Sequence, residues 1–341
     1  MTLRPTLEPP RVGARLAGTG SATPSRVLTN ADFEKMMDTS DEWIVQRTGI
    51  HTRRIIDKSA DENALTLATQ ALTAALADAR MTGSDLDLLI LATISMEMHC
   101  PPTACQLIAA VGGQNCGAYD LSAACCSFVF AMNTAWGLIR SGMYRNVAVV
   151  GADTISTFMD YDSRGRSTAI LFGDAAGAVI MRATDDTSKG LIAQTMHSDG
   201  NRWVDLYIPE KMSHFPEGVE PNPEALHRVQ MNGKGVFKFA VSTFPDVIAQ
   251  TLDAADLKPD EVDHYICHQS NARILEAARE RFGLPKEKLY VNIDRYGNTV
   301  SASVPLCFDE LRRAGRVHEG QRVMFVAFGG GLTWGTSLWQ L

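Results

Sequence analysis

Residues 62–95 contain the pattern that decides the fold class: ENALTLATQALTAALADARM, then TGSDLD, then LLILATIS. Apolar residues recur at helical spacing from Glu62 to Met81, among good helix formers. The short acidic turn TGSDLD leads into LLILATIS, whose uninterrupted apolar run suits a strand buried on both faces. We therefore predict a helix, a turn and a strand. Because helix and strand patterns alternate along the whole chain, we predict an α/β protein.

A second passage repeats this plan. GVFKFAVSTFPDVIAQTLDAADL (Gly235–Leu257) predicts a helix, KPDEVD a turn and HYICHQS a strand. Residues 144–154 and 320–331 each predict a strand, followed by a turn of small residues and a returning strand. Any two strand–helix–strand units share some likeness, and the period is too long for a solenoid. We nevertheless infer an internal duplication, with two similar halves packed together.

The predicted halves are separated by a less regular segment. We place an N-terminal half at residues 12–196 and a C-terminal half at residues 234–341. Residues 197–233 between them are rich in proline, glycine, asparagine and charge, with little periodicity. Such a long segment predicts a surface excursion or lid rather than a linker.

Size and composition indicate an ordinary globular protein. The chain has 341 residues, which suits two domains or a doubled fold, and 45% of them are hydrophobic. The net charge of −7 argues against a nucleic-acid-binding protein, which needs a clustered basic face. We find neither a run of 18 apolar residues for a membrane span nor the apolar core of a signal peptide in MTLRPTLEPPRVGAR. The seven cysteines lack CxxC spacing, so we expect free thiols in a reducing cytoplasm.

The stretch YDLSAACCSF (Tyr119–Phe128) places Cys125 and Cys126 between small residues and a predicted helix. Unpaired N–H groups and the dipole at a helix N-terminus favour a thiolate, so we expect a lowered thiol pKa. This is one way to activate a nucleophile. The alternative is a small buried cysteine that only fills space.

Two later motifs offer partners for such a nucleophile. His268 in CHQSNARI (Cys267–Ile274) ends a predicted strand, where loops of open α/β sheets carry function, although it could also be a core histidine. His264 lies four residues before it, but with no third ligand in view we expect no metal site. Asn298 in DRYGNTVSASVP is either a turn residue or an amide donor to an oxyanion.

The glycines in AFGGGLTWG (Ala327–Gly335) allow backbone N–H groups to approach a ligand closely, and the motif lacks the GK[ST] of a phosphate loop. Together, the motifs place Cys125, His268 and Asn298 in that chain order, each on a predicted strand-end loop.

From about Gly18 to Leu341 the chain resembles the β-ketoacyl-acyl-carrier-protein synthase III family, within the thiolase-like superfamily. The motifs that carry the resemblance occur in family order: TNADFEKMMDTSDEWIVQRTGIHTRRI, AAC followed by Phe128, FGDAAGAV, MNGKGVFKFAV, HQSNARI, YGNTVSASVP and FGGGLTWG. The resemblance implies a thiolase-like fold, with two duplicated halves in a five-layer α-β-α-β-α arrangement, and a homodimer.

The resemblance also implies a reaction. It is the decarboxylative condensation of an acyl-CoA starter, expected to be acetyl-CoA, with malonyl-acyl-carrier protein. The product is a 3-oxoacyl-acyl-carrier protein, which initiates fatty-acid synthesis. An acyl-cysteine is the intermediate. Coenzyme A enters only as the substrate thioester, so we expect neither a cofactor nor a metal.

The resemblance further implies the roles of individual residues in this chain. Cys125, rather than Cys126, aligns with the nucleophile. His268 and Asn298 align with the pair that assists decarboxylation. Gly330 aligns with the glycine whose N–H completes an oxyanion hole with that of Cys125. The positions aligned with the coenzyme A and pantetheine route are Thr39, Trp43, Arg47, Arg166, Phe237 and Asn271. Lys238 and Arg273 align with a basic patch for the acidic carrier protein.

The sequence departs from the family pattern at several positions. Cys126 and Ser127 stand where alanine or serine and then glycine are expected. Cys100 stands where a phenylalanine often caps the partner subunit's acyl site, so a bulkier starter is a possibility that the sequence leaves open. Arg164 competes with Arg166 for the coenzyme A contact.

Three other functions remain open at this point. One is a starter-unit condensing enzyme or acyltransferase of a natural-product pathway. A remote one is a Cys-His-Asn hydrolase, although the cysteine-protease signature CG[SA]C[WY] is absent. The third is a non-catalytic binding module, against which the intact Cys–His–Asn set argues.

Overall fold

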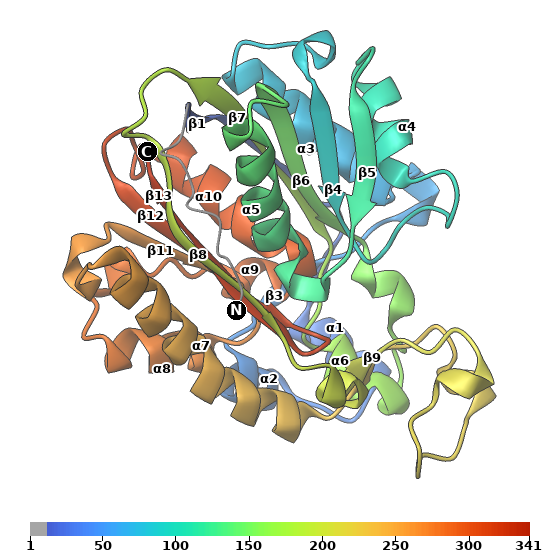
Figure 1. The fold of residues 1–341 in the computed structure, drawn as a ribbon. Coiled ribbons are helices and arrows are strands. Elements are labelled where there is room, and N and C mark those ends of the chain that lie inside the picture. The colour runs from blue at the N-terminus through green and yellow to red at the C-terminus, as the bar shows by residue number, and fades with distance from the viewer. Residues whose placement is uncertain (1–11) are drawn as a thin grey trace.

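Two large β-sheets, with helices between them and on both outer sides, organise the chain (Figure 1). A computed structural model describes residues 12–341. Residues 1–11 lie outside the described residues. They make up most of MTLRPTLEPPRVGAR, the segment in which we expect no signal peptide. Within the described part, no helix is both long and apolar enough to span a membrane.

The first sheet has five strands. In spatial order they are β1 (Gly13–Ala22), β7 (Ala175–Thr184), β6 (Asn146–Asp153), β4 (Leu88–Ala92) and β5 (Gly117–Leu121). β4 is the strand expected in LLILATIS, and all five of its residues are buried. Leu88 and Ile90 pack into the layer between the sheets, whereas Leu89 and Leu91 pack under helices on the outer side. Burial on both faces explains the uninterrupted apolar run.

The second sheet repeats the first with one strand fewer. In spatial order its strands are β11 (His264–Cys267), β12 (Arg322–Gly329), β13 (Thr333–Gln340) and β8 (Gly190–Ser198). β11 is parallel to β12, while β12–β13 and β13–β8 are antiparallel. The order β4, β6, β7, β1 in the first sheet has the same directions. This correspondence confirms the predicted duplication.

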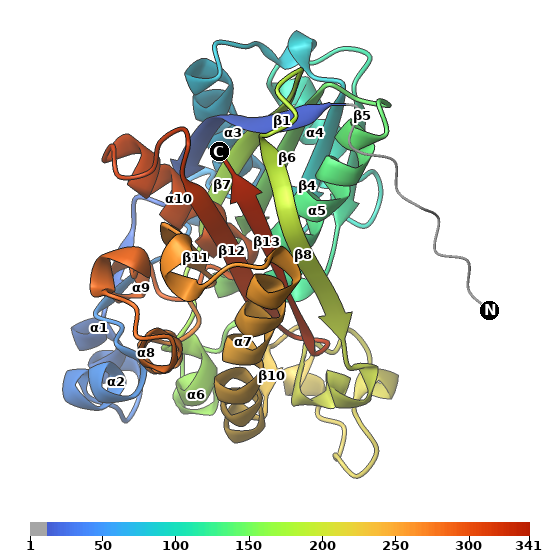
Figure 2. The same cartoon turned by 60° about the vertical axis from the view of Figure 1, so that its left-hand side comes forward.

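Helices form the other three layers, as a second view shows (Figure 2). α3 (Ala64–Asp78) and α4 (Thr103–Ala110) cover the outer face of the first sheet. α5 (Ser127–Arg140) and α10 (Ser303–Arg313) fill the layer between the sheets. α7 (Gly233–Ala255) and α8 (Ala272–Arg281) cover the outer face of the second sheet. The five-layer α-β-α-β-α arrangement is therefore confirmed.

The segment between the halves differs in part from the expectation. β8 pairs with β13 in the second sheet, so the predicted boundary between residues 196 and 197 falls inside a strand. That strand joins the C-terminal half because its hydrogen-bonding partner is there, which local sequence does not reveal. Residues 199–232 lie outside both large sheets and carry the short strand pair β9 (Leu206–Tyr207) and β10 (Gln230–Met231) with three 3₁₀ helices. Most of this excursion is drawn in yellow at the lower right of Figure 1.

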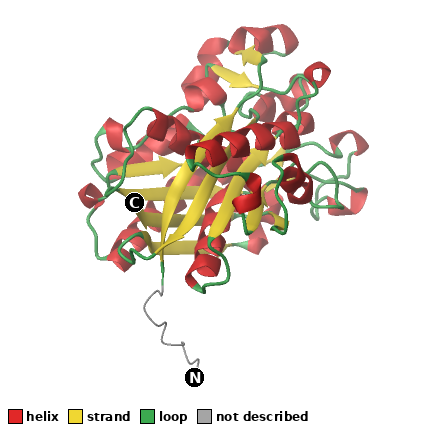
Figure 3. Ribbon diagram, turned by 90° about the horizontal axis from the view of Figure 1, so that it is seen from above, coloured by secondary structure: helices red, strands yellow, loops and turns green. Residues whose placement is uncertain are grey.

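A further group of short elements lies at the strand ends near Cys125. It comprises β2 (Val27–Thr29), α1 (Asn30–Met36), α2 (Asp41–Thr48), β3 (Thr52–Arg54), α6 (Arg166–Ala169) and α9 (Ile293–Tyr296). Seen from above, strands run through the middle of the molecule, with helices on their flanks (Figure 3). β3 is tied to α9, since the Thr52 hydroxyl donates to the Arg295 carbonyl at 2.9 Å. The N-terminal half thereby contacts the loop that leads to Asn298.

Gly49, at the end of α2, lies against Ala272 at the start of α8. It ends α2 in the left-handed conformation, with φ of 77°. A Cβ placed there would lie 2.4 Å from the Ala272 Cβ, far inside van der Waals contact. Only glycine satisfies both constraints.

Replacing Gly49 with alanine is therefore expected to destabilise the protein more than the same change at Gly112. Gly112 has a similar φ of 73°, but a Cβ there meets open space. Both variants incur the left-handed strain, whereas G49A adds overpacking, worth about 1–3 kcal/mol more. Urea unfolding of the two variants measures the difference. Equal losses would show that α2 and α8 separate at negligible cost.

Candidate active site

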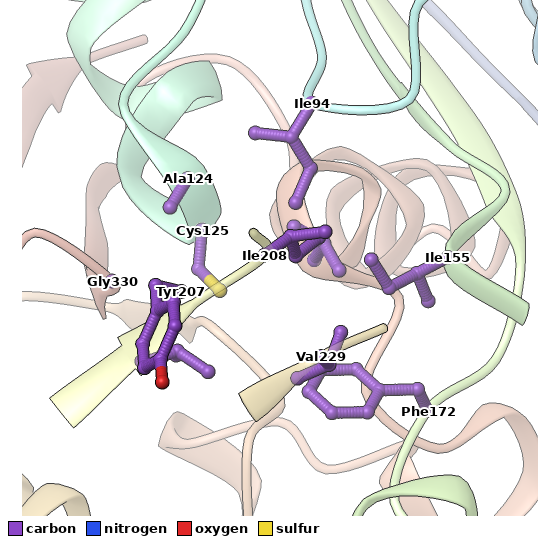
Figure 4. A pocket seen from close by; sticks show the side chains of 11 residues that line it. Ile94, Ala124, Cys125, Ile155, Phe172, Tyr207, Ile208, Val229 and Gly330 are labelled. Atoms are coloured by element: carbon purple, nitrogen blue, oxygen red, sulfur yellow. The ribbon is translucent and has the colours of Figure 1, made fainter. Parts of the chain in front are cut away.

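Cys125 lies in the turn that joins β5 to α5. A short 3₁₀ helix, Ala124–Cys126, follows the strand, and α5 begins at Ser127. The Ser127 hydroxyl donates to the Ala124 carbonyl and accepts from the Ala123 N–H, each at 2.7 Å. This reciprocal pair fixes the turn and leaves the Cys125 side chain, 6% exposed, directed into a cavity (Figure 4).

The end of β12 packs closely against Cys125. A Cβ at Gly329 would lie 2.7 Å from the Cys125 Cβ and 3.1 Å from its Sγ. Gly329 therefore has no room for a side chain, and the following residue, Gly330, lines the same cavity. Sequence reasoning selected Gly330 and missed Gly329, although the run of three glycines was the available signal.

The expected low pKa of Cys125 is wrong for the resting protein. Burial raises its pKa to about 12, and the nearby Asp153 carboxylate adds to the rise. The N–H groups of Cys125 and Gly330 act in the opposite direction, but they do not offset the loss of solvation. The resting thiol is therefore protonated, and its proton has to leave during the reaction.

Cys126 points into a different environment. It belongs to the core between the two sheets, whereas Cys125 belongs to the apolar cluster around the cavity. Burial also raises the pKa of Cys126 well above the ordinary value. The two adjacent cysteines thus face different parts of the protein, and of the two only Cys125 lines the cavity.

His268 follows the last residue of β11, and its own N–H donates to the Val326 carbonyl at 2.8 Å. The side chain is 1% exposed, and Nδ1 lies 2.7 Å from the Ser303 hydroxyl. Burial lowers its pKa to about 3, so the ring is uncharged near neutral pH. When the Ser303 hydroxyl donates to Nδ1, the ring proton lies on Nε2, which is then the donor available to a substrate.

Asn298 is fixed on both sides of its backbone. Its N–H donates to the Leu171 carbonyl at 2.8 Å, and its carbonyl accepts from the Gly173 N–H at 3.0 Å. The Val300 N–H donates to Oδ1 at 2.9 Å. Because an N–H can only donate, the side-chain atom facing it must be the oxygen, which leaves the amide NH₂ group as a donor.

Shared neighbours connect these residues, although neither His268 nor Asn298 is among the residues that line the cavity at Cys125. The turn Val300–Ala302, directly after Asn298, packs against the turn that carries Cys125. Val300 lines the cavity, and its carbonyl lies 3.0 Å from the hydroxyl of Ser303, the residue that contacts His268. Phe172 pairs with Asn298 and also lines the cavity. Two halves of the chain thus meet around one thiol.

The cavity itself is apolar, with a volume of about 250 Å³. Figure 4 shows the Cys125 sulfur directed toward branched and aromatic side chains. The wall comes from both halves and from the excursion 199–232, and sequence reasoning identified none of its apolar members: Ile94, Ile155, Phe172, Leu206, Tyr207, Ile208, Val229 and Val300. These residues are separated in sequence and look like ordinary core, so no local signal marks them.

The expected coenzyme A contacts gather around Trp43 on α2. The guanidinium carbons of Arg166 and Arg47 lie 4.2 and 4.8 Å from its ring centroid. Arg164 instead pairs with Asp162 and Glu224. The structure therefore brings Arg166, rather than Arg164, to the tryptophan. Trp43 packs on the same apolar cluster as Cys125.

Two buried polar atoms in this region have no hydrogen-bond partner, Thr39 Oγ1 and Arg166 Nε. Asn271 is already engaged, because its amide donates to the Arg47 carbonyl at 3.0 Å and its oxygen caps α8.

The expected carrier-protein residues lie nearby on α7 and α8. Arg273 lies over the Phe237 ring at 5.2 Å, and both Arg273 and Lys238 are exposed. Among residues 12–341, no group of three or more histidine, cysteine, aspartate or glutamate side chains could hold a metal ion.

Comparison with known proteins identifies relatives across nearly the whole chain. Family models described as 3-oxoacyl-[acyl-carrier-protein] synthase III match residues 119–200 and, for its C-terminal part, residues 252–341. The β-ketoacyl-[acyl-carrier-protein] synthase III of Caldanaerobacter subterraneus is 42% identical over 96% of this chain and 98% of its own length.

Two solved structures extend the comparison. The 3-oxoacyl-[acyl-carrier-protein] synthase III of Aquifex aeolicus has a TM-score of 0.88 and 39% identity, over 96% of this chain and 100% of that one. The priming β-ketosynthase of the R1128 polyketide pathway also has a TM-score of 0.88, with 31% identity, over 98% of this chain and 99% of that one.

The raised pKa of Cys125 predicts how it reacts with iodoacetamide. Its alkylation rate should rise about tenfold per pH unit between about pH 7 and pH 9.5, without a plateau, because only the thiolate reacts. Peptide mass spectrometry resolves Cys125 from the exposed Cys100, which serves as the internal reference. A plateau below about pH 8 would instead indicate the lowered pKa expected from the helix position.

Proposed function

This chain belongs to the 3-oxoacyl-[acyl-carrier-protein] synthase III family, and we propose how its residues carry out the family's condensation. The chain is a condensing enzyme of the acyltransferase class that initiates fatty-acid synthesis. Its family acts on acyl-CoA and malonyl-acyl-carrier protein. The roles of the individual residues, the starter, the dimer and the cytoplasmic location are proposals.

Cys125 is the nucleophile of the first half-reaction. Its sulfur attacks the thioester carbonyl of the starter, and the N–H groups of Cys125 and Gly330 hold the resulting oxyanion. Coenzyme A leaves with the proton that the thiol loses, and an acyl-cysteine remains. The single observation that supports this role is the position of the sulfur, which lies beside both N–H groups and inside an apolar cavity.

His268 and Asn298 act in the second half-reaction. Malonyl-acyl-carrier protein loses carbon dioxide, and negative charge develops on its thioester oxygen. The neutral imidazole and the Asn298 amide supply hydrogen bonds to that oxygen, and losing one such donor typically costs about 100-fold or more in rate. The carbanion then attacks the acyl-cysteine, forms the carbon–carbon bond and expels the Cys125 thiolate, which takes up a proton from solvent to restore the resting thiol.

Coenzyme A approaches along the Trp43 side of the site. An aromatic ring between Arg166 and Arg47 suits the base and phosphates of the nucleotide. The unpartnered Thr39 hydroxyl offers a polar contact along the pantetheine route, to which we also assign Phe237 and Asn271. The exposed Lys238 and Arg273 suit an acidic carrier protein.

We also propose a homodimer. β5 is an edge strand of the first sheet, and exposed edges are templates for pairing with another chain. Met96, Met98 and Cys100, between β4 and α4, are exposed as well.

We propose a cytoplasmic location. All seven cysteines carry free thiols, which suits a reducing cytoplasm.

The cavity favours a starter larger than acetyl. A cavity of about 150 Å³ already holds benzene, and the cavity beside Cys125 measures about 250 Å³. An acetyl group would leave most of this apolar volume unfilled. The same observation keeps a natural-product starter enzyme as the second candidate function, whereas a hydrolase has no support among the relatives described.

Labelling with a radioactive acyl-CoA tests the nucleophile. C125A is expected to abolish the acyl-enzyme, because the thiol in the cavity is lost. C126A should keep it, since Cys126 faces the core between the sheets. Intact-protein mass spectrometry counts the label. A label retained by C125A and lost by C126A would reverse the assignment.

A panel of acyl-CoA substrates tests the starter. We expect kcat/KM to rise by up to about fourfold per added methylene until the cavity is full, given roughly 0.8 kcal/mol per buried methylene. I155W should reduce the use of long starters more than that of acetyl-CoA. I192W, at an exposed position on β8, is the matched control. A strict preference for acetyl-CoA in the unchanged enzyme would refute the larger starter.

A further inference from the structure

Asp153 is a buried carboxylate to which the mechanism gives no role. It is the last residue of β6 and has no exposed surface. Five donors converge on it. They are the Ile94 N–H at 2.8 Å, the Thr93 and Ser95 hydroxyls at 3.2 and 3.1 Å, and the Ser301 N–H and hydroxyl at 3.1 and 2.5 Å. A carboxylate away from solvent needs such donors, because burial without them is costly.

The two oxygens of this carboxylate serve different halves of the chain. Oδ1 accepts from residues 93–95, in the loop after β4 of the N-terminal half. Oδ2 accepts both bonds from Ser301, in the C-terminal half. One side chain therefore joins the two loops that carry Ile94 and Val300, and both of these residues line the cavity at Cys125.

Ser301 lies in the middle of the turn that carries Asn298 and Ser303. Asn298 is three residues before it, and Ser303, which contacts His268 Nδ1, is two residues after it. The Ser301 hydroxyl also lies 2.8 Å from the Ala92 carbonyl at the end of β4. This serine is thus the point where the turn 298–303 is attached to the first sheet.

We propose that Asp153 is a positioning residue, which holds the turn 298–303 at the distance from Cys125 that lets Asn298 and His268 reach the acyl-cysteine. The proposal depends on the roles proposed above for Cys125, Asn298 and His268. It assigns no contact with substrate to Asp153. The carboxylate acts through Ser301, and the consequence appears in the condensation step.

Asp174 provides a matched control within the same chain. It is also fully buried, and it accepts from the Ser156 N–H and hydroxyl and from the Ile56 N–H. All of these partners belong to the N-terminal half. A carboxylate-to-amide change at Asp174 therefore tests the cost of losing a buried acceptor without loosening the bond to Ser301.

The experiment measures the two half-reactions separately in D153N and D174N. Asparagine keeps the shape of the side chain, but whichever way its amide turns, an N–H faces donors of the loop 93–95 or of Ser301. In D153N we expect self-acylation within about threefold of the unchanged enzyme. We expect condensation of the preformed acyl-enzyme with malonyl-acyl-carrier protein to fall by about 10- to 100-fold, the scale of a 1 Å misplacement. D174N should change both steps by less than about threefold.

A second variant, S301A, tests the same hydrogen bond in case D153N folds poorly. S301A removes the hydroxyl that Asp153 holds and leaves the carboxylate in place. It should also slow condensation more than self-acylation, and D153N/S301A should be non-additive, since both changes release the same turn. Thermal unfolding of each variant gives the stability change for comparison.

Two results would overturn the proposal. One is an equal loss of both half-reactions in D153N and D174N that follows the loss of stability. The other is full additivity of D153N with S301A. Failure of the proposed function would appear differently, because the unchanged enzyme would then form no acyl-Cys125 or would not condense it with malonyl-acyl-carrier protein.

Discussion

The site depends on the close approach of three backbone segments around one sulfur atom. The end of β12 reaches Cys125 at Gly329, where a Cβ would lie only 3.1 Å from the thiol. The turn Val300–Ala302 closes from the other half of the chain. These segments and the apolar wall of the cavity bury the thiol, and the resulting loss of solvation governs its chemistry.

Burial holds the Cys125 thiol and the His268 imidazole in their neutral forms. The pKa of Cys125 rises to about 12 and that of His268 falls to about 3, in both cases mainly through desolvation. A neutral thiol and a neutral imidazole suit an apolar acyl chain in an apolar cavity. Reactivity then has to come from hydrogen bonds aimed at the charge that develops during the reaction, at Cys125 and Gly330 in one step and at Asn298 and His268 in the other.

The duplicated architecture explains why both halves contribute to one site. Each half presents strand ends and a helix N-terminus toward the same region, with α5 following Cys125 and α10 following Asn298. The two halves are then joined by specific polar contacts, among which the carboxylate of Asp153 connects the loop 93–95 with Ser301. The wall of the cavity combines residues from both halves with Leu206, Ile208 and Val229 of the excursion.

Apolar periodicity and short motifs are local properties of the chain, so they sufficed to predict the α/β class, the duplication and the order of Cys125, His268 and Asn298. Three features became apparent only in the folded chain: β8 joins the second sheet, Arg166 rather than Arg164 lies on Trp43, and the pKa of Cys125 is raised. Each of these depends on residues far apart in sequence, as does the apolar wall of the cavity. A helix N-terminus can be predicted from a motif, but the solvation of a thiol depends on everything that packs around it.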